Sequence, residues 1–379
     1  MSKLCKASCH VLENISSSPS SASEPDLAKI HTDFLSLLSM VYHAATKLAL
    51  ALNPTEPTFS AAISPLDDLV KHTNAVTSCA SLFTTTFGST LRTEVIGLAL
   101  DVLQATKGFV DNCVLITGGT APPPKLKPTH LYLTGSLHEL IDHSRGPDGL
   151  SKDNLQAVRK KWSQDRSVLE DGYRELSELL ISDGVDSYPF NEDSDDQDGL
   201  ILESVPLTAK ETQRVKKVCT STSCSRYLKP SGIQVQTYIR VTNLFHKRVY
   251  DDLLKPPPIE VSPPPNLGSA LDKISHQSAR FVSTTDDIIS CLHSPQDPKE
   301  ISASVQNLRE VATTLQRLLI KNDLLPKPRE QNSESQIESM TVGGSKSNQE
   351  KARDTRKWFD TCIDQVDKLQ VSLSAEFNG

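Results

Sequence analysis

The stretch from Asp183 to Gly199, DGVDSYPFNEDSDDQDG, divides the sequence. Seven of its 17 residues are Asp or Glu, and none is Lys or Arg. Like charges at this density repel one another in a compact state, so such runs usually stay solvated. Apolar residues recur at helical spacing on both sides of the stretch. We therefore interpret residues 183–207 as an acidic hinge between two helical halves.

The composition favours helices over sheets. Aromatic residues make up only 5% of the chain, whereas sandwiches and barrels use more aromatic and β-branched residues. A length of 379 residues exceeds the size at which one core keeps growing, so two domains are expected. We predict an all-α fold in which two helical bundle subdomains of antiparallel helices are joined by the acidic hinge.

The predicted N-terminal bundle, residues 23–182, follows a disordered N-terminus of residues 1–22. Apolar residues spaced three and four apart predict five helices in it. The start signals are a capping-box pattern at Ser23 and a Ser64-Pro65 pair that places proline at the first helical position of the second helix. Gly88 is expected to cap the end of that second helix.

The predicted C-terminal bundle covers residues 208–379. Its first helix begins at a capping box at Thr208, and three-and-four spacing predicts further helices after it. A proline-rich linker, residues 255–265, and a polar, disordered segment, residues 326–348, interrupt the bundle. The sequence contains no convincing strand and no repeat of fixed period.

No combination of residues predicts catalysis or a metal. Cys5, Cys9 and His10, and separately Cys219 and Cys224, lack the further paired ligands that a structural zinc site needs. Phosphate-loop, zinc-protease and hydrolase motifs are absent from the sequence. We therefore expect no cofactor, no metal and no enzymatic activity.

Charge and hydropathy indicate which partners the chain has. A net charge of −7 argues against a nucleic-acid-binding surface and suits protein partners. The longest apolar stretch, Ala44–Leu52, is interrupted by Lys47 and is far too short to span a bilayer. Because Met1–Leu12 has no secretory pattern, we expect a soluble intracellular protein in a reducing compartment, with most cysteines buried as small hydrophobes.

Several segments in order resemble the cyclin-D-binding protein family, also called GCIP-like. They are AATKLALAL (Ala44–Leu52), GSTLRTEVIGLALDVLQA (Gly88–Ala105), VLEDGYRELSELL (Val168–Leu180), the acidic insert after it, and the capped helix near Thr208. The resemblance implies an all-helical scaffold without catalysis. It also implies protein partners of the cyclin or helix-loop-helix type and a location in the cytoplasm and nucleus.

These observations lead to a primary hypothesis of a non-enzymatic protein-interaction scaffold that regulates cell-cycle progression or transcription. A helix face would pack on the partner, and the acidic hinge would attract a basic surface. The candidate partner-binding residues of the hinge are Glu192, Asp193, Asp195, Asp196 and Asp198. A solvated spacer is the alternative for the hinge. For the whole chain, the alternatives are a vinculin-like adhesion bundle that binds cytoskeletal proteins and a helical domain that binds a small molecule or is catalytic.

Overall fold

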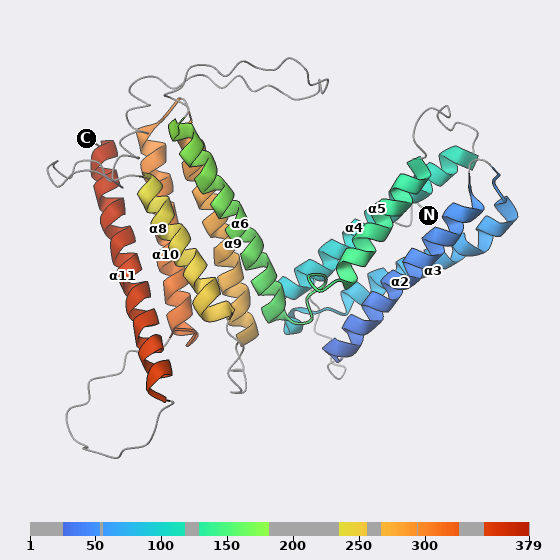
Figure 1. The fold of residues 1–379 in the computed structure, drawn as a ribbon, viewed down its shortest axis with the longest axis horizontal. Coiled ribbons are helices and arrows are strands. Elements are labelled where there is room, and N and C mark those ends of the chain that lie inside the picture. The colour runs from blue at the N-terminus through green and yellow to red at the C-terminus, as the bar shows by residue number, and fades with distance from the viewer. Residues whose placement is uncertain are drawn as a thin grey trace. The chain divides into compact units, whose positions relative to one another are not determined.

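The computed structural model describes residues 26–53, 56–117, 129–181, 235–255, 267–293, 295–325 and 345–378. These residues form nine α-helices with one short 3-10 turn and one π turn, and they contain no strand (Figure 1). The chain divides into two compact units, Met1–Lys160 and Lys161–Gly379. Within each unit, successive helices run in opposite directions (Figure 1). The prediction of an all-α fold is confirmed.

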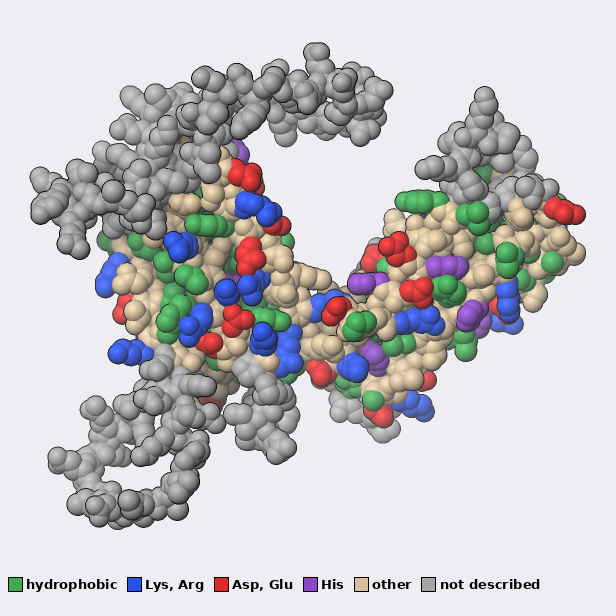
Figure 2. All heavy atoms as spheres, viewed as in Figure 1, with side chains coloured by type: hydrophobic (Ala, Val, Ile, Leu, Met, Phe, Trp, Pro, Cys, Tyr) green, Lys and Arg blue, Asp and Glu red, His purple; other side chains and the backbone are tan. Residues whose placement is uncertain are grey.

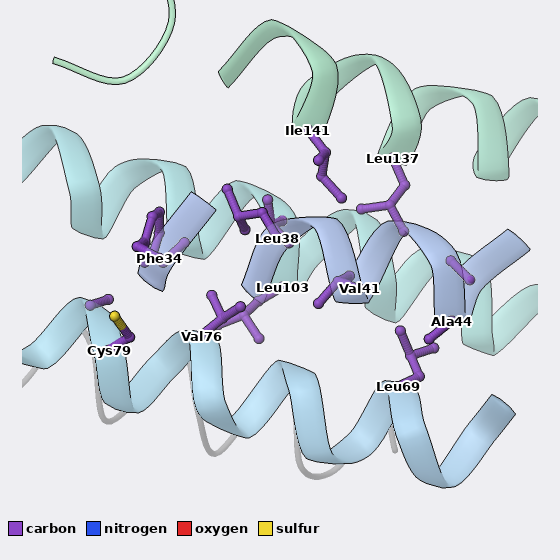
Figure 3. Packing of buried hydrophobic residues seen from close by; sticks show 14 of the residues in the cluster. Phe34, Leu38, Val41, Ala44, Leu69, Val76, Cys79, Leu103, Leu137 and Ile141 are labelled. Carbon is purple, nitrogen blue, oxygen red and sulfur yellow. The ribbon is translucent and has the colours of Figure 1, made fainter. Parts of the chain in front are cut away.

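The first unit is built on four helices. They are α2 (Leu27–Ala51), α3 (Phe59–Ser81), α4 (Ser89–Thr117) and α5 (Thr129–Arg145), with a 3-10 turn, η1 (Thr85–Phe87), before α4. Side chains from all four converge on one core (Figure 3). Phe34, Leu38 and Val41 of α2 face Leu69 and Val76 of α3, so most of the two predicted apolar stripes is buried, whereas Leu66 of the second stripe is exposed. Leu103 of α4, with Leu137 and Ile141 of α5, completes the core.

Helix α2 begins three residues later than the capping-box pattern at Ser23 predicts. Asp26 is the N-cap, and its Oδ1 accepts a hydrogen bond of 3.0 Å from the backbone N–H of Ala28. Ser23 lies outside the described residues. Because one Asp side chain satisfies an otherwise unpaired donor of the first turn, α2 has its own start signal.

Helix α2 is long enough and apolar enough to cross a membrane, by length and composition alone. The prediction that no segment spans a bilayer considered only Ala44–Leu52 and overlooked this property of the whole helix. Core helices of bundles have the same property. Eight of its residues are buried, and they line one face that packs against α3 and α5. This is the pattern of a helix inside a bundle.

The predicted start of the second helix at Ser64-Pro65 is wrong. Helix α3 begins at Phe59, and Pro65 lies inside it with its ring buried. Proline removes one backbone donor, but a helix can continue through it when tertiary packing compensates. Gly88 does not cap α3 either. It follows η1 with φ of +109°, a conformation that glycine adopts without strain.

The second unit contains five helices. They are α6 (Asn154–Ile181), most of which lies in this unit, α8 (Val235–Arg248), which continues into a π turn, η3 (Val249–Leu254), α9 (Leu267–Cys291), α10 (Pro298–Lys321) and α11 (Ser345–Asn378). Aromatic rings fill its centre: Phe245 contacts Phe281 and Phe359 at centroid distances of 6.3 and 5.2 Å. The Tyr238 hydroxyl donates to the Val305 carbonyl oxygen over 3.0 Å, which ties α8 to α10.

The division between the units falls inside α6, whereas the sequence placed the end of the first bundle at residue 182. Asn154, at the start of α6, contacts the first unit, because its Oδ1 accepts a hydrogen bond from the backbone N–H of Leu91 over 3.0 Å. Trp162 contacts the second unit, and its Nε1 donates to the His246 carbonyl oxygen over 3.1 Å. A helix that changes neighbours along its length keeps one apolar period, so periodicity does not reveal the change.

Several predicted segments lie outside the described residues. They are the N-terminus of residues 1–22, the acidic hinge of residues 183–207, the helix that begins at Thr208, and nearly all of the linker of residues 255–265. The predicted disordered segment, 326–348, extends four residues too far, since α11 begins at Ser345. The first residues of α11 are polar, so apolar spacing could not mark its start.

Candidate protein-interaction surface

The five acidic residues predicted to bind a partner, Glu192, Asp193, Asp195, Asp196 and Asp198, lie outside the described residues. The structure neither brings them together nor separates them. A candidate surface must therefore come from side chains that the described helices leave exposed.

Helix α3 carries an exposed apolar stripe beside its buried face. Phe59, Ile63 and Leu66 are 54%, 64% and 37% exposed, and Val70 continues the row half-buried. At 3.6 residues per turn, these four positions fall within an arc of about 60°. The buried positions of the same helix, such as Leu69 and Val76, lie about a quarter of a turn away. Such spacing is typical of a helix that presents a second apolar face to a partner.

More exposed apolar side chains gather at the end of the first unit where α3 begins. The antiparallel arrangement places the last turns of α2 and α4 and the first turns of α3 and α5 at this end (Figure 1). Each of these turns exposes large apolar side chains. We call this set the apolar end: Leu50, Phe59, Ile63, Val114, Leu115, Leu131 and Tyr132. Figure 2 shows hydrophobic side chains exposed in this region.

Exposed hydrophobic residues that occur singly need no explanation, but this group is not scattered. Leu50 and Tyr132, each more than 70% exposed, belong to turns that meet at one end of one bundle. Grouped apolar exposure of this kind marks surfaces that bind other proteins.

A polar seam between α2 and α5 has a structural role. The ring of Tyr42 stacks on that of His138 with centroids 3.7 Å apart, and Thr46 Oγ1 lies 3.0 Å from His138 Nε2. Burial lowers the pKa of His138, and the neighbouring His43 acts in the same direction. The seam thus favours a neutral imidazole that bonds across the two helices and fixes their register.

The second unit buries an Asp, a Ser and a His in one hydrogen-bonded chain. Ser278 Oγ lies 2.7 Å from Asp165 Oδ2 and 2.8 Å from His246 Nε2. The carboxylate can only accept, so Ser278 donates to it, and His246 donates from Nε2 to the serine oxygen. Burial, and to a smaller extent Arg166, lowers the pKa of His246 to about 3, which keeps the ring neutral.

This chain of groups differs from a nucleophile–base–acid triad. In a triad the histidine stands between the hydroxyl and the carboxylate, whereas here the serine stands in the middle. Ser278 and His246 are both fully buried, and Trp162 stacks on the His246 ring at 4.4 Å. The arrangement is suited to holding α6, α8 and α9 together.

Metal-ligating side chains do not gather within the described residues, where no group of three or more His, Cys, Asp or Glu could hold an ion. The thiols there are mostly buried. Burial raises the pKa of Cys79 and Cys113 to about 11 and that of Cys362 to about 12. The prediction that cysteines act as small buried hydrophobes is confirmed for these three.

Sequence reasoning missed Phe59 and Ile63 because it began the helix at Ser64. The signal was present: Phe59, Ile63, Leu66 and Val70 follow four-three-four spacing across the proline. A proline within a helical pattern predicts a helix start, but α3 begins six residues before Pro65 and continues through it.

The fold defines the class of protein: an all-α protein made of helical bundles, one of which exposes a group of large apolar side chains at one end. Residues 33–182 match the family model described as Grap2 and cyclin-D-interacting, N-terminal. Over these residues the chain is similar to this GCIP-like family, and the resemblance found from the sequence is confirmed there. No curated protein matches the chain. The matched residues include the α3 stripe and the whole apolar end.

Proposed function

We propose that the chain is a non-enzymatic interaction scaffold that binds a cyclin-D-type regulator through the apolar end of its first unit. The observation that carries the proposal is the coincidence of two findings on the same residues. The matched family domain is described as cyclin-D-interacting, and it contains the cluster of exposed apolar side chains. Regulation of the cell cycle or transcription is the role we infer from such a partner.

The surface has the features that bind proteins with useful affinity. Fully burying one large apolar side chain contributes about 1.5–3 kcal/mol, from which the entropic costs of association are subtracted. Binding energy usually concentrates in a few large central side chains, with aromatic residues prominent among them. Phe59 and Tyr132 are the aromatic members of the apolar end, and Ile63 extends it along α3. We assign Phe59 and Ile63 the central contribution because they also belong to the α3 stripe.

The test is to measure the affinity of the full chain for a purified D-type cyclin by biolayer interferometry. Replacing Phe59 and Ile63 with Ser should weaken binding about tenfold or more, since truncating a contributing interface side chain costs about 1 kcal/mol or more. The matched control replaces Val168 and Val371 with Ser, two residues of the second unit that are similarly exposed. Equal affinities of the two double variants would exclude the apolar end as the site, and no binding by the unmodified chain would exclude the partner.

The acidic hinge is proposed to assist capture through charge. Neutralising Glu192, Asp193, Asp195, Asp196 and Asp198 together should slow association and reduce the dependence of binding on salt, because long-range attraction acts mainly on the association rate. If the variant with all five acidic residues neutralised binds the partner as tightly as the unmodified chain does, at both low and high salt, the hinge is only a spacer.

We further propose that the chain works in the cytoplasm and the nucleus, as its resemblance to the family implies. Fractionation of cells that express a tagged full chain tests the location. Recovery from membranes alone would contradict it, and it would assign α2 a different role.

A further inference from the structure

A shallow pocket lies between α6 and α8 in the second unit, whereas the apolar end belongs to the first unit. Its volume is about 210 Å³, and apolar atoms form most of its walls. Leu169 and Tyr173 contribute from α6, and Leu244 contributes from α8. Leu244 is 43% exposed although it lies beside a buried core, so the pocket presents apolar surface to solvent.

Positive charge surrounds this apolar floor. Arg166 also lines the pocket, but its Nε donates to Glu170 Oε1 over 2.8 Å, and these two charges offset one another. Arg240 and Lys247 line the α8 side, one turn before and one turn after Leu244, and both are exposed. Neither forms an ion pair with another described residue. In Figure 2, Lys and Arg side chains appear among hydrophobic ones on the face over α6 and α8.

Size and charge together restrict the ligand. Pockets for drug-sized molecules have volumes of about 300–1,000 Å³, so one of about 210 Å³ admits a single large side chain. Arg240 and Lys247 lie two turns apart on α8, and both are exposed at the opening of the pocket. They favour a ligand that carries a carboxylate on either side of the side chain that enters the pocket.

We propose that the groove between α6 and α8 binds an acidic peptide segment of a partner protein. An aromatic or leucine side chain of that segment enters the pocket onto Leu244 and Leu169, and flanking carboxylates pair with Arg240 and Lys247. Recognition then combines one apolar anchor with electrostatic selection by the flanking charges. The site is separate from the proposed cyclin-binding surface and shares none of its side chains, so either proposal can fail alone.

The experiment uses the full chain and a fluorescent synthetic peptide in which one Phe is flanked by Asp and Glu. Fluorescence anisotropy should show saturable binding that weakens as salt is raised. Replacing Arg240 and Lys247 with Gln should weaken binding about tenfold, and Leu244→Ser should do so by removing the anchor contact. The matched control replaces Lys357 and Lys368 of α11 with Gln, which makes the same charge change on exposed positions. Circular dichroism checks that each variant folds.

Peptide controls separate the pocket from simple charge attraction. A peptide with Ala in place of Phe should bind about tenfold more weakly, since the pocket is then empty. The proposal is overturned by undetectable binding, by equal loss in the two double variants, or by indifference to the Phe. Binding that appears only after deletion of residues 183–199 would also overturn it, because the chain's own acidic stretch would then be the occupant.

Discussion

Gly88 and Asn154 form a cap that no local sequence pattern reveals. Gly88 precedes α4 and has no side chain to satisfy the free N–H groups of the first turn. Asn154, 66 positions later, supplies the acceptor through its bond to Leu91. A Cβ on Gly88 would overlap the Asn154 carboxamide. The glycine is thus required both by its positive φ and by the approach of this side chain.

The prediction at this cap concerns stability. Asn154→Ala should lower the free energy of unfolding by about 1–2 kcal/mol, the usual cost of losing an N-cap. Gly88→Ala should cost more than that, because it strains the backbone and displaces the same carboxamide. Urea denaturation of the full chain measures both, with Gly97→Ala as the control, since nothing lies within 4 Å of a Cβ there. A Gly88→Ala variant as stable as the parent would show that the overlap is easily relieved.

His246 makes stability depend on pH in a definite direction. Its pKa is lowered from 6.5 to about 3 in the folded chain, so the folded state keeps the ring neutral while the unfolded state protonates it. The unfolded state then binds more protons between these values, and stability falls as the pH drops through that window. This group contributes a slope of at most about 1.4 kcal/mol per pH unit.

The measurement is the free energy of unfolding from about pH 7 down to about pH 4, where the slope arises. His246→Gln should be less stable at neutral pH but should show a shallower decline on acidification. His143→Gln, at an exposed position, is the matched control and should leave the slope unchanged. A parent slope equal to that of His246→Gln would mean that the ring protonates without unfolding.

Among the elements, periodicity predicted the existence of the described helices well and their boundaries poorly. The stripes through Phe34 and Leu38, or through Leu308 and Leu315, are continuous because one face of each helix must be buried. Boundaries depend on capping and on tertiary neighbours, as Asp26 and Pro65 show. Gly172 is another residue whose role depends on a tertiary neighbour. Glycine is unfavourable inside a helix such as α6, but a Cβ at this position would lie 2.9 Å from Ile289 Cδ1. It allows close approach of α9.

Pro65 should divide α3 into a weakly and a strongly protected part. Because proline has no N–H, the Ala61 carbonyl lacks the usual helical donor, and the turns from Phe59 to Ser64 are held by fewer bonds. Hydrogen exchange should therefore be faster at Ile63 and Ser64, the first N–H groups with acceptors inside the helix, than at Leu69–Ala80. Pro65→Ala should slow exchange in the first part about fivefold, the effect of one hydrogen bond of about 1 kcal/mol. Exchange in α4 is the internal reference, and uniform protection along α3 would contradict the prediction.

At the scale of the molecule, the sequence indicated two helical groups but not where they divide. The acidic stretch is the largest change in composition, so the sequence predicts a boundary at residue 182. The family match also ends there. In the structure, the side chains of α6 beyond Lys160 pack on α8 and α9, since Trp162 meets His246 and Asp165 meets Ser278. Which helix a buried side chain meets is a tertiary fact, and neither spacing nor charge encodes it. The apolar end likewise required the packed bundle, because exposure depends on which neighbours cover each turn.

The location of this division predicts how fragments behave. The chain has two tryptophans, Trp162 and Trp358, so a fragment of residues 1–182 contains Trp162 alone. In the full chain Trp162 is fully buried against His246. Without the second unit it should become exposed, and its fluorescence maximum should shift to longer wavelength than that of the full-length Trp358→Phe variant. Acrylamide should quench the fragment more strongly.

A fragment of residues 1–160 serves as the matched control for folding. It should be helical and should unfold cooperatively at nearly the same temperature as the fragment of residues 1–182, because both retain the core of α2 to α5 and the Asn154 cap. Residues 161–182 should then add exposed apolar side chains without adding stability. If the longer fragment instead keeps Trp162 shielded and unfolds at a clearly higher temperature, α6 belongs with the first unit, and the boundary lies at the acidic stretch after all.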